Sequence, residues 1–253
     1  MKVAILAPIP HLEAFCTTDY HLVLSHLVHQ DPEYAEFYKR QSSHSYIILD
    51  NSAHEFGKET DGERLLEAAE LCGAHEIVLP DRLFFGRDTL RKSTAGYKYL
   101  SDVVLLGTNF LVVPQGRTLK EWRECLRGLL ELSTTVGLSK DYETWPGGLP
   151  RLAKIIMKEG GRQIHLLGCP RSVGQLLKLR RLPGVRGTDS AKPLVLASQG
   201  QVFPSSKDIR KDTELDYVGR KGDYFHDTIS TAYLPFASCN TFRYRRLCED
   251  PTL

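Results

Sequence analysis

The chain has 253 residues, of which 42% are hydrophobic and 25% are charged, and its formal net charge is +2 at pH 7. This composition is ordinary for a soluble globular protein, and the length suits one barrel or two small domains. No apolar run approaches the ~20 residues of a membrane-spanning helix. The six cysteines form no CxxC pair, so neither a zinc knuckle nor a disulfide framework is indicated. We therefore predict a cytoplasmic protein with no metal, no cofactor and no membrane contact.

Apolar, β-branched runs alternate with helical patterns along the chain. Strands are predicted near residues 2–8, 46–50, 76–80, 110–114, 134–138, 163–168 and 185–188. Helices are predicted near residues 19–29, 61–73, 88–100, 118–132, 148–159 and 172–181. The apolar run LVLAS at 194–198 is the candidate for an eighth strand. This alternation predicts a parallel sheet and an α/β fold, a single (β/α)8 barrel of the TIM type over residues 1–253.

The end of the chain departs from this rhythm. The segment near 199–221 is polar, and we interpret it as an insertion over the site or as a disordered segment. The segment 224–253 is basic and aromatic, and in it Phe242 and Tyr244 interleave with arginines. Aromatic rings among arginines can stack on bases and hold phosphates. The alternative is a surface helix that packs its aromatic side chains inward.

The positive charge is concentrated in one stretch. Residues 151–192 contain ten Lys or Arg against two acids, a net charge of +8, so the remaining residues carry −6. Such a local basic field suits a polyanionic partner, whereas the alternative is a solvated helix face. The candidate phosphate contacts are Arg180, Arg181, Arg186 and Lys192 from this stretch, with Arg243 and Arg245 from the tail.

Several apolar runs end on a polar residue. Asp50, Asp81, Gln115 and Asp189 each follow such a run, and another run ends on Gly137 and Leu138, whose backbone groups could also bind a ligand. In a parallel barrel the active site is built at the carboxyl ends of the strands. Two carboxylates on that face also suit chemistry at the anomeric carbon of a sugar.

Six segments together resemble the tRNA-guanine transglycosylase family. In chain order they are DNSAHEFG at 50–57, LPD ending at 81, VPQG at 113–116, VGLS at 136–139, HLLGCP at 165–170 and TDSAKP at 188–193. Each of them is weak alone, but together they occur in the order of the family's motifs. The resemblance implies a barrel enzyme, a glycosyltransferase that exchanges a guanine base.

The chain also departs from the family pattern. Asn51 is inserted in the first motif, where Ala53 and His54 replace a pair of glycines. The Cys-rich zinc site of the tRNA enzymes, which helps to dock tRNA, has no counterpart here, and the chain is considerably shorter. These departures favour the branch, found in phages and bacteria, that inserts 7-deazaguanines such as preQ0 into DNA.

The resemblance implies a role for each residue of the site. Asp189 matches the nucleophile that captures the sugar as a glycosyl-enzyme, and Asp50 matches the acid or base that moves the proton. Asp81 matches the acceptor for guanine N1–H and the 2-amino group. On the 6-oxygen side, the substrate is expected to meet Gln115 and the backbone of Gly137 and Leu138, with Asn51 and Ser52 as further binding residues.

Each of these residues also has a structural interpretation. Asp50 is a favoured helix or loop cap, Asp81 could pair with Arg82, and Ser52 with Glu55 fits a capping box. Three other functions stay open: base exchange on tRNA, a non-catalytic partner subunit, and a nucleoside hydrolase. The sequence leaves the incoming deazaguanine, the strandedness of the DNA and the oligomeric state open.

Overall fold

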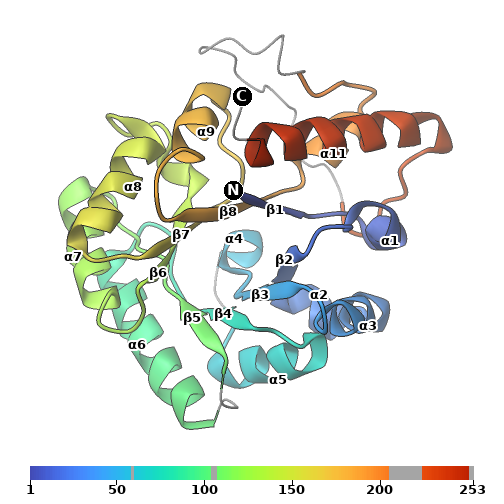
Figure 1. Cartoon of the computed structure of the whole chain (residues 1–253). Coiled ribbons are helices and arrows are strands. Elements are labelled where there is room, and N and C mark those ends of the chain that lie inside the picture. Colours follow the sequence, from blue (N-terminus) through green and yellow to red (C-terminus); the bar gives the residue numbers. More distant parts are fainter. Residues whose placement is uncertain (58–59, 104–106, 205–223, 251–253) are drawn as a thin grey trace.

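The computed structural model describes residues 1–57, 60–103, 107–204 and 224–250. Within them eight parallel strands form an inner ring, and helices surround it (Figure 1). The strands are β1 (Lys2–Ile5), β2 (Tyr20–Leu24), β3 (Tyr46–Asp50), β4 (Glu76–Val78), β5 (Asn109–Leu111), β6 (Thr135–Ser139), β7 (Gln163–Leu167) and β8 (Val185–Ser190). The fold is the α/β barrel of the TIM type that the sequence predicts.

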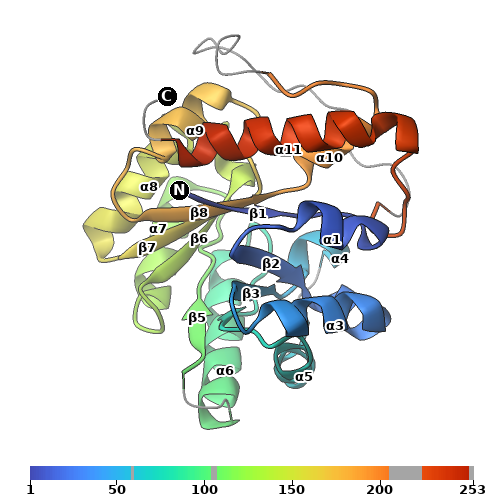
Figure 2. The ribbon, with the colours of Figure 1, turned by 45° about the vertical axis from the view of Figure 1, so that its right-hand side comes forward.

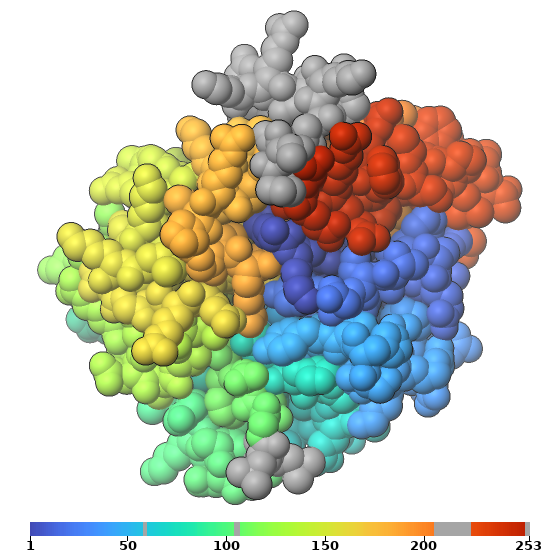
Figure 3. All heavy atoms as spheres, in the orientation of Figure 1, coloured from blue at the N-terminus to red at the C-terminus, as the bar shows by residue number. Residues whose placement is uncertain are grey.

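The ring consists of two four-stranded sheets, ordered β1-β8-β7-β6 and β2-β3-β4-β5. At one junction a parallel bridge between Val112 and Val136 joins the end of β5 to β6. At the other junction β1 lies beside β2. Figure 3 shows the same circular order on the surface, where the last helix meets the first residues of the chain.

Helices lie outside the strands and in the loops. They are α1 (Leu12–Phe15), α2 (Ser25–Gln30), α3 (Pro32–Gln41), α4 (Ala53–Phe56), α5 (Gly62–Cys72), α6 (Gly86–Val103), α7 (Leu119–Leu129), α8 (Gly148–Glu159), α9 (Val173–Leu179), α10 (Lys192–Ser198) and α11 (Leu234–Glu249). Single 3-10 turns are η1 (Ile9–His11), η2 (Lys140–Tyr142) and η3 (Thr231–Tyr233). Among the described residues, no helix is long and apolar enough to cross a membrane.

The eighth strand is not where the sequence places it. Residues 194–198, predicted as a strand, lie in the buried helix α10, and the region 19–29, predicted as a helix, divides into β2 and α2. All five residues of β2 are buried. A short buried apolar run carries no periodicity that separates a strand from a helix. Pro193, in the first turn of α10, fits a helix start because it needs no amide donor there.

The other predicted helices are found with their end signals. Thr118 caps α7 by accepting a hydrogen bond from the Glu121 amide at 3.2 Å. Gly73 ends α5 in the left-handed conformation, with φ of +68°. The Glu121 carboxylate accepts from the amides of Arg117 and Gly86, so it also fixes the loops before α6 and α7. These loops stand at the carboxyl ends of β4 and β5.

The last described segment is helical and packs on the barrel. Helix α11 lies against α10 and β1 (Figure 2). Tyr244 points inward and is fully buried against Phe203, whereas Phe242 is 65% exposed. The inward-packing interpretation therefore holds for one of the two aromatic residues. Most of the polar segment near 199–221 lies outside the described residues.

Candidate active site

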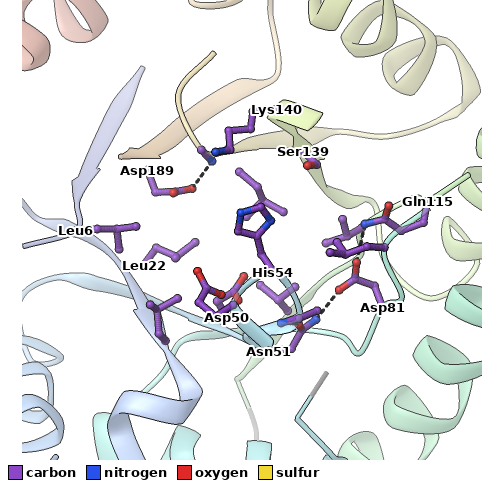
Figure 4. Close-up of a pocket in the computed structure, with 18 residues that line it drawn as sticks. Leu6, Leu22, Asp50, Asn51, His54, Asp81, Gln115, Ser139, Lys140 and Asp189 are labelled. Atoms are coloured by element: carbon purple, nitrogen blue, oxygen red, sulfur yellow. Dashed lines mark hydrogen bonds between the residues drawn. The ribbon is translucent and has the colours of Figure 1, made fainter. Parts of the chain in front are cut away.

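A cavity of about 110 Å³ opens at the carboxyl ends of the strands. Its wall includes four carboxylates, Asp50, Glu55, Asp81 and Asp189, together with apolar side chains such as Leu6 and Leu22 (Figure 4). The cavity lies where barrel enzymes carry their active sites.

Asp189 reaches the cavity from the end of β8 and is buried. Its Oδ1 accepts a hydrogen bond from the Gly168 amide at 3.0 Å. The same oxygen lies 3.1 Å from Nε2 of His165, a fully buried residue of β7. The predicted nucleophile is therefore held at one oxygen by two groups of the neighbouring strand and its following loop.

Asp50 is the last residue of β3, where its Oδ1 accepts from the Ser52 amide at 2.7 Å. Burial raises the pKa of Asp50 well above its ordinary value, and the nearby carboxylates of Glu55, Asp81 and Asp189 raise it further. Asp50 thus fixes the turn into α4, as the capping interpretation holds, and also faces the cavity. A carboxyl group with a raised pKa can both give and take a proton near neutral pH.

Asp81 is clamped between two side-chain amides. Its Oδ1 accepts from Nδ2 of Asn51 at 2.8 Å, and its Oδ2 accepts from Nε2 of Gln115 at 2.6 Å (Figure 4). The Asn51 side chain also donates from Nδ2 to the Leu79 carbonyl, and its Oδ1 accepts from the Ala53 backbone amide. Because both oxygens of Asp81 receive donors, the direction of the carboxylate in the cavity wall is fixed.

Gln115 acts chiefly as a support in this geometry. Its Oε1 accepts from the Tyr142 hydroxyl at 2.6 Å and from the Phe84 amide at 3.0 Å. Phe84 has a φ of +64°, a strained conformation for a residue other than glycine, which the Gln115 contact helps to hold. Arg82, the expected structural partner of Asp81, forms an ion pair with Asp88.

Three predicted binding residues are turned away from the cavity. The Gly137 amide donates to the Val112 carbonyl within the barrel wall, and the cavity is lined instead by the next residues along, Ser139 and Lys140. Leu138 is fully buried in β6 and is likewise not among the lining residues. The Ser52 hydroxyl contacts Ser25 and His26, and it does not cap α4. The capping box of Ser52 with Glu55 is therefore wrong.

Two histidines near the carboxylates were not predicted as site residues. His165 lies within an apolar strand, and its Nδ1 is 2.8 Å from the hydroxyl of Tyr20 on β2. His54 on α4 projects into the cavity (Figure 4), with its Nδ1 3.8 Å from Asp141. Residues placed in contact across the barrel by different strands cannot be recognised from spacing along one strand.

Three of the candidate phosphate contacts, Arg180, Arg181 and Arg186, do not lie at the mouth of the site. Arg186 pairs with the buried Glu76 and shares a cavity with residues at the starts of other strands, such as Lys2. Arg180, the C-cap of α9, donates to the Leu247 carbonyl at 2.5 Å, and Arg181 follows it. A helix between parallel strands runs back to the amino end of the next strand, so its C-terminus faces away from the site.

The other predicted cations have mixed positions. On α11, Arg243 donates to the Phe203 carbonyl, and Arg245 lies 3.5 Å from Glu249. Lys192 is buried beside the site, and its Nζ donates to the Pro170 carbonyl at 3.2 Å. It lines a second cavity with Lys140, Arg171, Asp141, Glu143, Thr144 and Cys169. Lys140 lines both cavities, so they adjoin.

No protein-family model and no curated protein matches the chain. Among solved structures, orotidine 5'-phosphate decarboxylase from Thermotoga maritima is similar over 75% of this chain and 88% of its own, at 10% identity and a TM-score of 0.45. A candidate dihydrodipicolinate synthetase from Pseudomonas aeruginosa is similar over 77% of this chain and 71% of its own, at 15% identity and a TM-score of 0.48. Within the described residues, no group of three or more His, Cys, Asp or Glu is arranged to hold a metal.

Proposed function

We propose that this protein is a guanine transglycosylase that replaces guanine in DNA with a 7-deazaguanine such as preQ0. The observation that carries the proposal is the convergence of Asp50, Asp81 and Asp189, each with different surroundings, in one small cavity. Asp189 is anchored at one oxygen, Asp50 has a raised pKa, and Asp81 is held by two amide donors. These surroundings suit a nucleophile, a proton carrier and a base reader, respectively.

The exchange proceeds by two displacements. In the first, Asp189 bonds to the anomeric carbon, the bond from that carbon to the base breaks, and Asp50 gives its proton to the leaving guanine. In the second, the incoming base displaces Asp189 from the sugar and gives its proton back to Asp50. Two inversions at the same carbon retain its configuration.

Recognition of the base follows from the clamp on Asp81. The two amide donors fix the direction of the carboxylate, whose oxygens are hydrogen-bond acceptors. Guanine and its 7-deaza analogues present two donors, N1–H and the 2-amino group, that match a carboxylate edge. On the 6-oxygen side the donors in the cavity wall are the Ser139 hydroxyl and the Lys140 ammonium group.

A nucleic acid also needs a place for its phosphates. The cavity that adjoins the base site contains Lys140, Arg171 and Lys192, and we assign the phosphate contact to Arg171. Two acids, Asp141 and Glu143, share this wall, but Glu143 accepts a hydrogen bond from the Arg171 amide and Asp141 faces His54. The choice of DNA over tRNA rests on the sequence resemblance alone, in which these 253 residues show no match to the Cys-rich site of the tRNA enzymes.

The test is transfer of a labelled base. The protein is incubated with radiolabelled guanine or preQ0 in three separate reactions that contain duplex DNA, single-stranded DNA or tRNA. The label incorporated into each polymer is then counted. We expect incorporation into DNA. Asp189→Asn is the matched control, because its amide oxygen can still accept from Gly168, and it should form no covalent protein–DNA adduct.

Each other outcome points to a different function. Label in tRNA alone would move the substrate to RNA. Release of free guanine from DNA or from a nucleoside without incorporation would make the protein a hydrolase. No exchange and no release with any polymer would favour a non-catalytic partner subunit, and an active Asp189→Asn variant would remove Asp189 from its role.

A further inference from the structure

A chain of polar groups crosses the interior of the barrel beneath Asp189. It starts at the Tyr20 hydroxyl, 2.8 Å from Nδ1 of His165, and continues from Nε2 of His165 to Oδ1 of Asp189 at 3.1 Å. All three side chains are at least 90% buried. Barrel interiors are usually filled by layers of apolar, branched side chains. Buried polar groups are tolerated when every member has a partner, as here.

The glycine at position 187 makes room for this chain. Gly187 lies on β8 two residues before Asp189, so both face the same side of the strand. A Cβ atom at position 187 would lie 2.5 Å from Cε1 of Tyr20 and 2.8 Å from its hydroxyl oxygen. The Tyr20 ring therefore occupies the space that a side chain would take in the layer below the nucleophile.

The hydrogen-bonding partners fix which imidazole nitrogen carries the proton. An ionised Asp189 can only accept, so Nε2 of His165 must donate to it. In neutral imidazole Nδ1 then has no proton and accepts from the Tyr20 hydroxyl. The Tyr20 contact thus holds His165 in the tautomer that serves Asp189.

Both donors to Asp189 reach the same oxygen. The Gly168 amide and Nε2 of His165 point to Oδ1, and within the described part of the chain Oδ2 accepts no hydrogen bond. Asp189 lines the base cavity (Figure 4). We infer that His165, kept in its Nε2–H tautomer by Tyr20, positions Asp189 so that Oδ2 is the atom that attacks the sugar. The kinetic part of this inference rests on the proposed function.

The arrangement also affects the second displacement. When Oδ2 bonds to the anomeric carbon, the electron pair of the broken bond leaves with the base, which takes the proton of Asp50. Oδ1 is then the carbonyl oxygen of the glycosyl ester, and its two donors polarise the ester. When the incoming base bonds to the sugar and gives its proton to Asp50, the pair of the Oδ2–carbon bond returns to Asp189. The same donors stabilise this departing carboxylate.

The first test needs no activity. In the full-length protein with ¹⁵N-labelled histidine, NMR should show the His165 ring in its Nε2–H tautomer. Tyr20→Phe should shift the Nδ1 signal and populate the other tautomer. Tyr46→Phe is the matched control, because the Tyr46 ring stacks on Tyr20 but does not contact His165. A proton on Nδ1 in the wild type, or no response to Tyr20→Phe, would overturn the inference.

The second test separates positioning from folding. His165→Phe keeps a planar ring but no donor, and it should lower kcat for exchange about 10- to 100-fold, the worth of one hydrogen bond to a charged group. KM for the incoming base should be unchanged, and His165→Gln, whose amide can still donate, should recover part of the rate. Equal rates in both variants, or a change in KM alone, would contradict the assignment. If the wild type exchanges no base, the NMR result alone decides the tautomer and the proposed function falls separately.

Discussion

Asp50 lies inside the site and has a raised pKa. The raised pKa lowers the stability of the folded protein near neutral pH, and this effect can be measured. The folded protein keeps a proton on this carboxyl group at pH values where the unfolded chain has lost it. Stability therefore falls as the pH rises from the ordinary Asp pKa through the raised one, because the native state binds the extra proton.

Asp50→Asn should remove this dependence and the exchange activity together. The asparagine oxygen can still accept from the Ser52 amide, so the turn into α4 should be kept. We expect the variant to be more stable than the wild type at pH 7, with a difference that disappears toward acidic pH. Chemical denaturation over a pH series measures it. A variant less stable than the wild type at every pH would mean that the carboxylate serves the fold.

Asp81 is the residue whose loss should change base binding most. Asp81→Ala takes away an acceptor from the side-chain amides of Asn51 and Gln115 and removes the acceptor edge, at an expected cost of about 2–4 kcal/mol in transition-state binding. Asp81→Asn should alter base preference. Initial rates with guanine and with an adenine-type base measure both effects. Wild-type guanine exchange in both variants would assign Asp81 to the fold.

At the scale of the element, β8 separates two functions at its two ends. Asp189 stands at the carboxyl end in the site, whereas Arg186 stands at the amino end and pairs with the buried Glu76. Arg186→Met should destabilise the protein by roughly 3 kcal/mol, because it leaves a buried carboxylate without its partner. Urea denaturation gives this value. DNA affinity of the folded variant should be unchanged, and a weaker affinity would return Arg186 to the phosphate contacts.

The elements also show where sequence patterns are sufficient. Helices with a strong amphipathic period and end signals, such as the one that begins after Thr118, were predicted within a few residues. The run from Tyr20 to Leu24 was not recognised as a strand, because every residue in it is buried. A buried strand and a buried helix have the same apolar composition, and only the place left for an eighth strand in the ring distinguishes them.

At the scale of the whole molecule, charge is distributed differently in space than along the sequence. The basic stretch 151–192 is contiguous, but Arg171 is near the site while Arg162 precedes β7 at the opposite end. Arg171→Ala should flatten the log–log salt dependence of DNA binding by about one unit. Arg162→Ala is the control of equal charge and should leave the slope unchanged. Equal effects of both would indicate a nonspecific basic field.

The sequence by itself determined the class of fold and the identity of the carboxylates. Strand-then-polar-tip units place Asp50, Asp81 and Asp189 on one face because parallel strands share a direction. What only the tertiary structure decided is which groups surround them. Tyr20 contacts His165, Gln115 donates to Asp81, and Arg186 pairs with Glu76 at the far end of the barrel. Each of these contacts joins residues from different strands or strand ends. Such contacts depend on how the strands are arranged in the barrel, and no local spacing encodes them.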